Sequence, residues 1–157
     1  MFYLSLVMGG LFLVMAHHLF DANWSVPIRR INEHLACLAP VMAVLFIPIV
    51  IFAPRLYKWW TIQPHSDHAL DSKAPLVTKP GFLIVALVCF VIWTVLSWAL
   101  RSQSLQQDKT GAAIHTKKMR VLSCVGIVLY ALTLTLGVIM WIKTLQHHWF
   151  STMFGVP

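Results

Sequence analysis

Two arginines and an acidic residue occur together in the segment Arg29-Arg30-Ile-Asn-Glu33. On a helix, Arg29 lies one turn before Glu33 and Arg30 lies three residues before it, so both guanidinium groups can reach the carboxylate. Glu33 would lie about 10 Å along the axis of an apolar helix, where an ionisable side chain is costly and by default suggests a functional site. Two interpretations stay open: an ion-pair clamp that fixes the helix, or a carboxylate that transfers protons or contacts substrate.

Three histidines extend the chemistry that this carboxylate could support. His17 and His18 end the first apolar segment, and His34 directly follows Glu33. An imidazole gains and loses a proton near neutral pH, so these side chains are candidates for a proton relay on the same face as Glu33. The alternatives are histidines of the wet headgroup layer, or axial haem ligands from two helices.

No other residues form a recognisable metal or enzyme site. All three cysteines lie in apolar runs without metal-ligand spacing: Cys37, Cys89 and Cys124. The sequence therefore predicts no disulfide framework, zinc site or iron–sulfur site, and His65-Ser-Asp67-His68 is interpreted as a solvated loop. Phosphate-loop, nucleophile-elbow and zinc-protease motifs are missing, so the sequence shows no complete active site. Gly9-Gly10 is interpreted as a close contact between helices.

Composition identifies the kind of element that positions these residues. Of 157 residues, 59% are apolar and 11% are charged. Because soluble domains carry about 25% charged residues and disordered chains are poor in apolar ones, both classes are excluded. The net charge of +7 forms no basic stripe with exposed aromatics, so nucleic acid is not an expected partner. An integral membrane protein in contact with lipid remains.

Four stretches are long enough to cross about 30 Å of hydrocarbon. We predict helices at about 2–20, 26–52, 82–101 and 119–144, separated by polar loops at 54–80 and 102–117. The predicted fold is all-α, a single transmembrane domain over 1–157 in which four helices form an antiparallel bundle.

Prolines and polar residues indicate where the helices begin and bend. Ser25 and Pro27 suit the first turn of the second helix, and Pro40 and Pro48 predict kinks or an early end. Lys79-Pro80-Gly81 is interpreted as a break before the third helix.

The charge distribution predicts an orientation. Seven cationic residues fall on the side reached after the first helix and five on the other, so residues 21–33 and 101–120 are expected to be cytoplasmic. The first span begins directly at Met1, and the segment 149–157 resembles the start of another element. We therefore expect a piece or a shortened relative of a longer membrane protein.

An ordered series of motifs gives a resemblance over nearly the whole chain. The series comprises Trp24 to Glu33; Pro48 with Leu56-Tyr57-Lys58-Trp59; Lys73, Lys79-Pro80 and Phe82; Phe90 to Trp93 with Leu96-Ser97; Arg101-Ser102, Ser104, Gln107-Asp108 and Gly111; and Trp141 with Trp149 to Thr152 and Gly155. In this order the motifs resemble the NrfD/PsrC-like membrane subunits of alternative complex III, in particular the ActF type, over the first of that family's two four-helix bundles.

The resemblance implies a place in a bacterial respiratory complex of the inner membrane. Such a complex oxidises quinol and passes electrons through iron–sulfur and haem c subunits, with proton movement coupled to it. An NrfD-like subunit holds no redox centre itself, so no cofactor is expected on this chain, although quinol could bind in the complex. The chain departs from the family at three positions that are usually polar: Val85, Cys89 and Met140.

Two function hypotheses follow from the residues and the resemblance together. In the first, the chain is a membrane subunit of a quinol-oxidising complex. Glu33 accepts or relays protons, Arg29 and Arg30 hold its charge, and the histidines pass protons to the cytoplasmic face: His17, His18 and His34. In the second, it is a purely structural membrane anchor, and the arginine–glutamate cluster only fixes the packing of its helices. A small b-type cytochrome is a third alternative.

Overall fold

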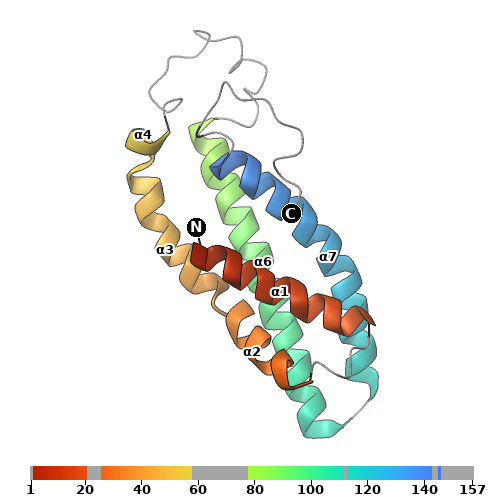
Figure 1. The fold of residues 1–157 in the computed structure, drawn as a ribbon. Coiled ribbons are helices and arrows are strands. Elements are labelled where there is room, and N and C mark those ends of the chain that lie inside the picture. Colours follow the sequence, from red (N-terminus) through yellow and green to blue (C-terminus); the bar gives the residue numbers. More distant parts are fainter. Residues whose placement is uncertain (1, 21–25, 58–77, 112, 143–144, 146–157) are drawn as a thin grey trace. The chain divides into compact units, whose positions relative to one another are not determined.

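The computed structural model describes residues 2–20, 26–57, 78–111, 113–142 and 145. Its helices are α1 (Phe2–Phe20), α2 (Val26–Ala36), α3 (Ala39–Ile51), α4 (Ala53–Leu56), α6 (Lys79–Thr110) and α7 (Ala113–Trp141) (Figure 1). Within these ranges there is no strand, so the all-α prediction is confirmed for the part of the chain that the structure describes.

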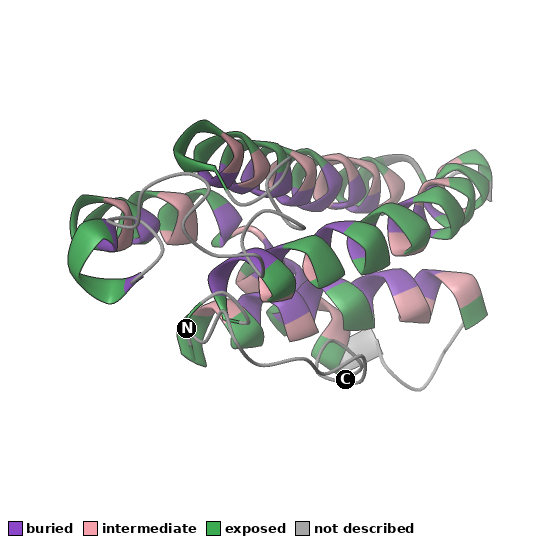
Figure 2. Ribbon diagram, turned by 90° about the horizontal axis from the view of Figure 1, so that it is seen from above, coloured by how far each residue is buried: buried purple, intermediate pink, exposed green. Residues whose placement is uncertain are grey.

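Four stretches of helix are long and apolar enough to cross a membrane. They cover Phe2–Phe20, Ile28–Ile51, Lys79–Lys109 and Ile114–Trp141, which correspond to the four predicted spans. Length and composition thus support the membrane class. Each of the long helices carries buried residues on one side and exposed residues on the other (Figure 2).

The polar segment 102–117, predicted to be a loop, is mostly helical. Helix α6 continues to Thr110 and α7 begins at Ala113. Gly111 ends α6 with a positive φ of 64°, and its N–H donates to the Gln107 carbonyl at 2.8 Å. The prediction was wrong because residues 101–110 contain polar side chains but no glycine or proline, and such residues propagate a helix well.

Helix α6 also begins three residues earlier than predicted. Lys79, Pro80 and Gly81 form its first turn instead of a break before it. The Thr78 hydroxyl accepts a hydrogen bond from the Gly81 N–H at 3.1 Å, as an N-cap residue does. Pro80 fits because a first-turn residue needs no N–H donor.

The second predicted helix is divided in two. Helix α2 ends at Ala36 and α3 begins at Ala39, and the Leu38 N–H donates to the Leu35 carbonyl in the turn between them. Pro40 explains the break, since it lacks an N–H and its ring would clash with the Ala36 carbonyl. Pro48, by contrast, lies inside α3, which ends one turn later at Ile51. Ser25 lies outside the described residues.

Contacts divide the chain into two compact units. Unit 1 comprises Met1–Val44 and Phe90–Ala131, and unit 2 comprises Leu45–Cys89 and Leu132–Pro157. In unit 1, Leu11 and Met15 of α1 and Trp93 of α6 are fully buried. The Tyr130 hydroxyl of α7 donates to the Met8 carbonyl of α1 at 3.2 Å. Helix α1 is therefore held in unit 1 by apolar packing and by a buried hydrogen bond.

Gly10 brings α1 and α2 close together. A β-carbon at Gly10 would lie 3.1 Å from the Leu35 β-carbon and 3.3 Å from the Asn32 carbonyl oxygen. At Gly9, no atom of the described residues lies within 4 Å of such a β-carbon. The predicted close contact is thus confirmed at Gly10 and absent at Gly9.

Aromatic side chains form the core of unit 2. The buried Tyr57 hydroxyl donates to the Trp141 carbonyl at 2.9 Å. The ring of Phe46 lies 4.8 Å from that of Trp141, and the ring of Tyr57 lies 5.2 Å from that of Phe82. These contacts hold Tyr57, which directly follows α4, against α6 and α7 within this unit.

Tyr57→Phe is expected to lower the free energy of unfolding by about 1 kcal/mol, because the hydrogen bond is lost and the Trp141 carbonyl stays buried. Burial raises the pKa of the Tyr57 phenol from 10.0 to about 12. The neutral Tyr57 phenol therefore makes its full contribution to stability below about pH 10, and this contribution is lost as the pH rises through about 12. In an alkaline titration followed by phenolate absorbance, one tyrosine of the unaltered protein should ionise late, near pH 12. This late phase should be smaller by one tyrosine in Tyr57→Phe. The exposed Tyr3→Phe is the control, and an unchanged late phase in Tyr57→Phe would contradict the assignment.

Candidate functional site

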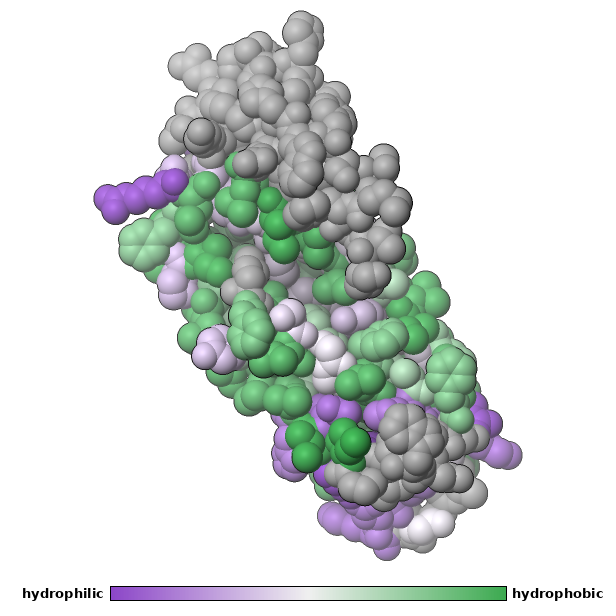
Figure 3. Space-filling model, viewed as in Figure 1, coloured by the Kyte–Doolittle hydropathy of each residue, from purple (hydrophilic) through white to green (hydrophobic). Residues whose placement is uncertain are grey.

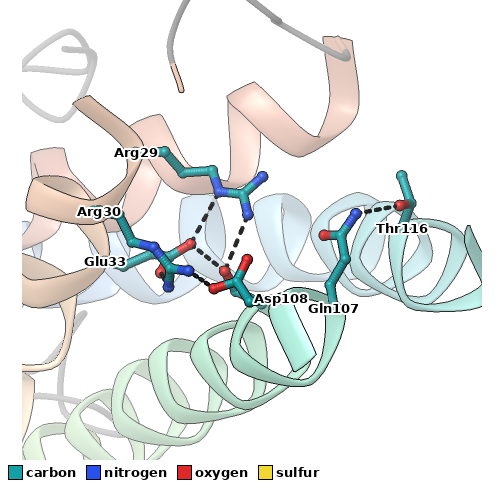
Figure 4. Close-up of polar contacts among 7 residues, drawn as sticks. Arg29, Arg30, Glu33, Gln107, Asp108 and Thr116 are labelled. Carbon is teal, nitrogen blue, oxygen red and sulfur yellow. Dashed lines mark hydrogen bonds and ion pairs between the residues drawn. The ribbon is translucent and has the colours of Figure 1, made fainter. Parts of the chain in front are cut away.

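Glu33 is the centre of a buried polar cluster in unit 1 (Figure 4). Its side chain is 3% exposed, and its Oε1 lies 3.2 Å from Arg29 Nε. Its Oε2 lies 3.1 Å from Arg30 Nη1. The fully buried Ser104 hydroxyl donates to Oε1 at 2.7 Å. Both carboxylate oxygens are therefore bound by cationic or hydroxyl groups.

Helix α6 supplies the other side of this cluster. Arg29 Nη2 donates to the Ser104 hydroxyl at 3.2 Å, and Arg30 forms an ion pair with Asp108. Ser104 and Asp108 are four residues apart and so lie on one face of α6. We call Arg29, Arg30, Glu33, Ser104 and Asp108 the Glu33 cluster. It joins α2 to α6 through side chains 71 to 78 residues apart in the sequence.

The cluster is neutral overall but unevenly exposed. The two arginines balance the two carboxylates, and a buried charge is tolerated only when it is paired and hydrogen-bonded, as Glu33 is here. The side chains of Arg30 and Asp108 are 40% and 45% exposed, so their pair is open to the surroundings and contributes about 0–1 kcal/mol. Glu33, in contrast, is enclosed. Most of the stabilisation that the cluster contributes therefore comes from the contacts of Glu33.

Arg29 and Arg30 both contact Glu33, as their helical spacing predicted. Ser104 and Asp108 were missed as members of the site, because their segment was expected to be a loop. Their spacing of four residues was the available signal, and it becomes informative once α6 is extended to Thr110.

The three predicted histidines lie apart from the carboxylate. The polar contacts of Glu33 in the described chain are with Arg29, Arg30 and Ser104. His34 is exposed, and its Nδ1 lies 3.2 Å from Arg101 Nη1 on α6. His17 and His18 lie in the last turn of α1, where His18 is buried. The structure thus brings the arginines to Glu33 and places no histidine in direct contact with its carboxylate.

Two further polar side chains are buried in unit 1. Asn32 and Ser123 are 5% and 0% exposed, and neither the Asn32 Nδ2 nor the Ser123 Oγ has a hydrogen-bond partner among the described residues. Buried polar groups are usually paired, so these two side chains are exceptions in the described part of unit 1. Sequence reasoning assigned neither of them a role.

Groups that could bind a metal are not gathered in the described part of the chain. There, no set of three or more His, Cys, Asp or Glu side chains could hold a metal ion. His65, Asp67 and His68, which were interpreted as a solvated loop, lie outside the described residues.

Two of the three positions that were expected from the resemblance to be polar are part of the core of unit 2. Cys89 and Met140 are each 1% exposed, and the Cys89 thiol donates weakly to the Thr133 carbonyl at 3.5 Å. Val85 is half-buried. Cys89 and Met140 therefore contribute packed side chains to this core.

In comparisons with known proteins, no family model matches the sequence and no curated protein matches it. The family assignment therefore stays a prediction from the ordered motifs.

Proposed function

We propose that the chain is an integral membrane subunit of a quinol-oxidising respiratory complex, similar to the NrfD-like subunits of alternative complex III, and that it serves there mainly as an anchor. The observation that carries the anchor role is the closed network around Glu33. The Arg29-Arg30-Ile-Asn-Glu33 segment, which belongs to the resembling motif, binds Ser104 and Asp108 of α6. A membrane anchor needs such fixed contacts between its helices.

Several finer features belong to this proposal. The four membrane-length helices form an antiparallel bundle in a bacterial inner membrane, with residues 21–33 and 101–120 on the cytoplasmic side. Iron–sulfur, haem c and sister NrfD-like subunits are the partners, and redox centres and quinol belong to them or to their interfaces. Large apolar side chains exposed on α6 and α7, such as Leu87, Val121 and Leu132, are available for lipid and for these partners.

The direct test is to isolate the tagged chain from its native membranes in mild detergent and to identify the proteins that accompany it. We expect a multihaem cytochrome and an iron–sulfur protein, together with quinol-dependent reduction of an electron acceptor. A tagged, unrelated four-helix membrane protein is the control. Purification of the chain alone, or with partners that lack redox centres, would contradict the respiratory assignment. A Soret band in the isolated chain would instead favour the b-type cytochrome.

Proton transfer is a second candidate function. It is favoured by the buried polar side chains in the same unit as Glu33, namely His18, Asn32 and Ser123. In this alternative Glu33 passes protons on, and Arg29 and Arg30 hold its side chain in place. The two roles predict different effects of Glu33→Gln: loss of assembled complex for the anchor, and loss of turnover or proton coupling for proton transfer.

A further inference from the structure

Unit 1 has an excess of cations around the turn between α6 and α7. Residues 101–120 contain five cationic side chains and one acidic side chain: Arg101, Lys109, Lys117, Lys118, Arg120 and Asp108. Asp108 is paired with Arg30. Lys109, Lys117 and Lys118 are exposed and have no ion-pair partner among the described residues. We call these three residues the lysine cluster. Hydrophilic side chains gather around this turn in Figure 3.

The lysine cluster continues an exposed apolar stripe of α7. Val121, Val125 and Leu132 follow Lys118 at 3, 7 and 14 residues, so they lie on its face of the helix. They are 65%, 56% and 60% exposed. From Val121 to the exposed Ile139 the stripe is roughly 27 Å long, close to the thickness of the hydrocarbon core. When this stripe faces acyl chains, Lys118 lies at the depth of the headgroups.

Helix α6 has the same arrangement. Trp98 is 71% exposed and shares a face with Leu105 and Lys109, which follow it at 7 and 11 residues. Exposed tryptophan is typical of the interface between membrane and water, and a lysine stem can extend toward the phosphate layer. Both helices therefore place an ammonium group, without an ion-pair partner in the described part of the chain, about one turn beyond lipid-compatible side chains.

We propose that the lysine cluster binds the headgroups of anionic phospholipids in the leaflet that it faces. The proposal rests on the membrane insertion contained in the proposed function. Phosphate is the anion that this geometry offers, because the apolar stripes below the lysines would contact the acyl chains of the same lipid. An acidic protein surface would pair with the lysines, but it would give the apolar stripes no apolar partner to contact.

The test compares lipid association in vesicles. The purified complex is reconstituted in phosphatidylcholine with spin-labelled phosphatidylglycerol or spin-labelled phosphatidylcholine, and electron spin resonance gives the ratio of the two association constants. Juxtamembrane lysines contribute about fivefold each to binding of anionic lipid, so Lys117→Gln/Lys118→Gln should reduce the preference by up to about 25-fold. The charge-preserving pair Lys117→Arg/Lys118→Arg should retain it, and raised salt should weaken it.

A second charge-removing pair shows whether the effect is local. Arg55→Gln/Lys79→Gln removes two exposed cations of unit 2 and should leave the preference within twofold of the unaltered protein. An unchanged preference in Lys117→Gln/Lys118→Gln, or an equal loss in both pairs, would overturn the lipid site. If an acidic protein is the true partner, the lipid preference stays unchanged in Lys117→Gln/Lys118→Gln. Release of the chain from vesicles by alkaline carbonate would contradict membrane insertion itself, and with it the proposed function.

Discussion

Glu33→Gln is expected to lower the free energy of unfolding by about 3–5 kcal/mol, because removal of one partner from a buried ion pair leaves the other charge uncompensated. Arg29, whose side chain is only 23% exposed, would lose its carboxylate. The new amide would also turn an N–H donor toward a guanidinium or toward the Ser104 hydroxyl. Unfolding in mixed micelles with increasing denaturing detergent, followed by circular dichroism, measures the loss.

Asp108→Asn is the matched control for this prediction. It neutralises a carboxylate that also binds an arginine of α2, but its side chain is 45% exposed. The expected loss is at most about 1 kcal/mol, as for other exposed pairs. Equal losses in Glu33→Gln and Asp108→Asn would show that burial of the Glu33 cluster does not decide its energetic importance.

The same variant separates the anchor role from proton transfer. If Glu33 is a clamp, Glu33→Gln reduces the amount of assembled complex while each remaining complex keeps its turnover and coupling. If Glu33 accepts protons, the complex assembles in normal amount and its turnover or proton coupling falls. The haem content of the partner cytochrome measures the amount of assembled complex. Turnover and proton coupling are then expressed per assembled complex. Normal assembly with normal coupling would contradict both roles.

The local half of the Glu33 cluster could be predicted because it depends only on helical spacing. Arg29 and Arg30 reach Glu33 from positions one turn away, and any helix over this segment brings them there. Ser104 is different, because it lies 71 residues away and its approach depends on how α2 packs against α6. No spacing rule contains that information, and the expectation of a loop at 102–117 concealed it further.

The element boundaries show the same division between local and non-local information. The break between α2 and α3 follows from the chemistry of Pro40, although the sequence did not distinguish its effect from that of Pro48. Helix α3 continues through Pro48, which shows that a proline inside an apolar helix need not end it. In unit 2, the hydrogen bond from Tyr57 to the Trp141 carbonyl joins residues 84 positions apart, and it depends on how distant aromatic residues such as Phe46 and Phe82 pack together.

Gly10→Leu is expected to have the second large effect, a loss of about 3 kcal/mol from overpacking between α1 and α2. A β-carbon at this position would already lie 3.1 Å from the Leu35 β-carbon and 3.3 Å from the Asn32 carbonyl oxygen. Neither atom is the end of a flexible side chain, so relief requires the two helices to separate. The same unfolding measurement in mixed micelles applies, and Gly10→Ala should give a smaller loss in the same direction.

Gly9→Ala is the control, because a β-carbon there would have no neighbour within 4 Å in the part of the chain that the structure describes. It should be neutral or stabilising by up to about 1 kcal/mol, since alanine is a better helix former than glycine. Equal destabilisation at both glycines would contradict the α1–α2 contact as the cause. Helix α2 is held by Gly10 on α1 and by Ser104 on α6, so separating it from α1 should also weaken the contacts of Glu33. The Gly10→Leu/Glu33→Gln double variant should therefore lose less than the sum of the single losses.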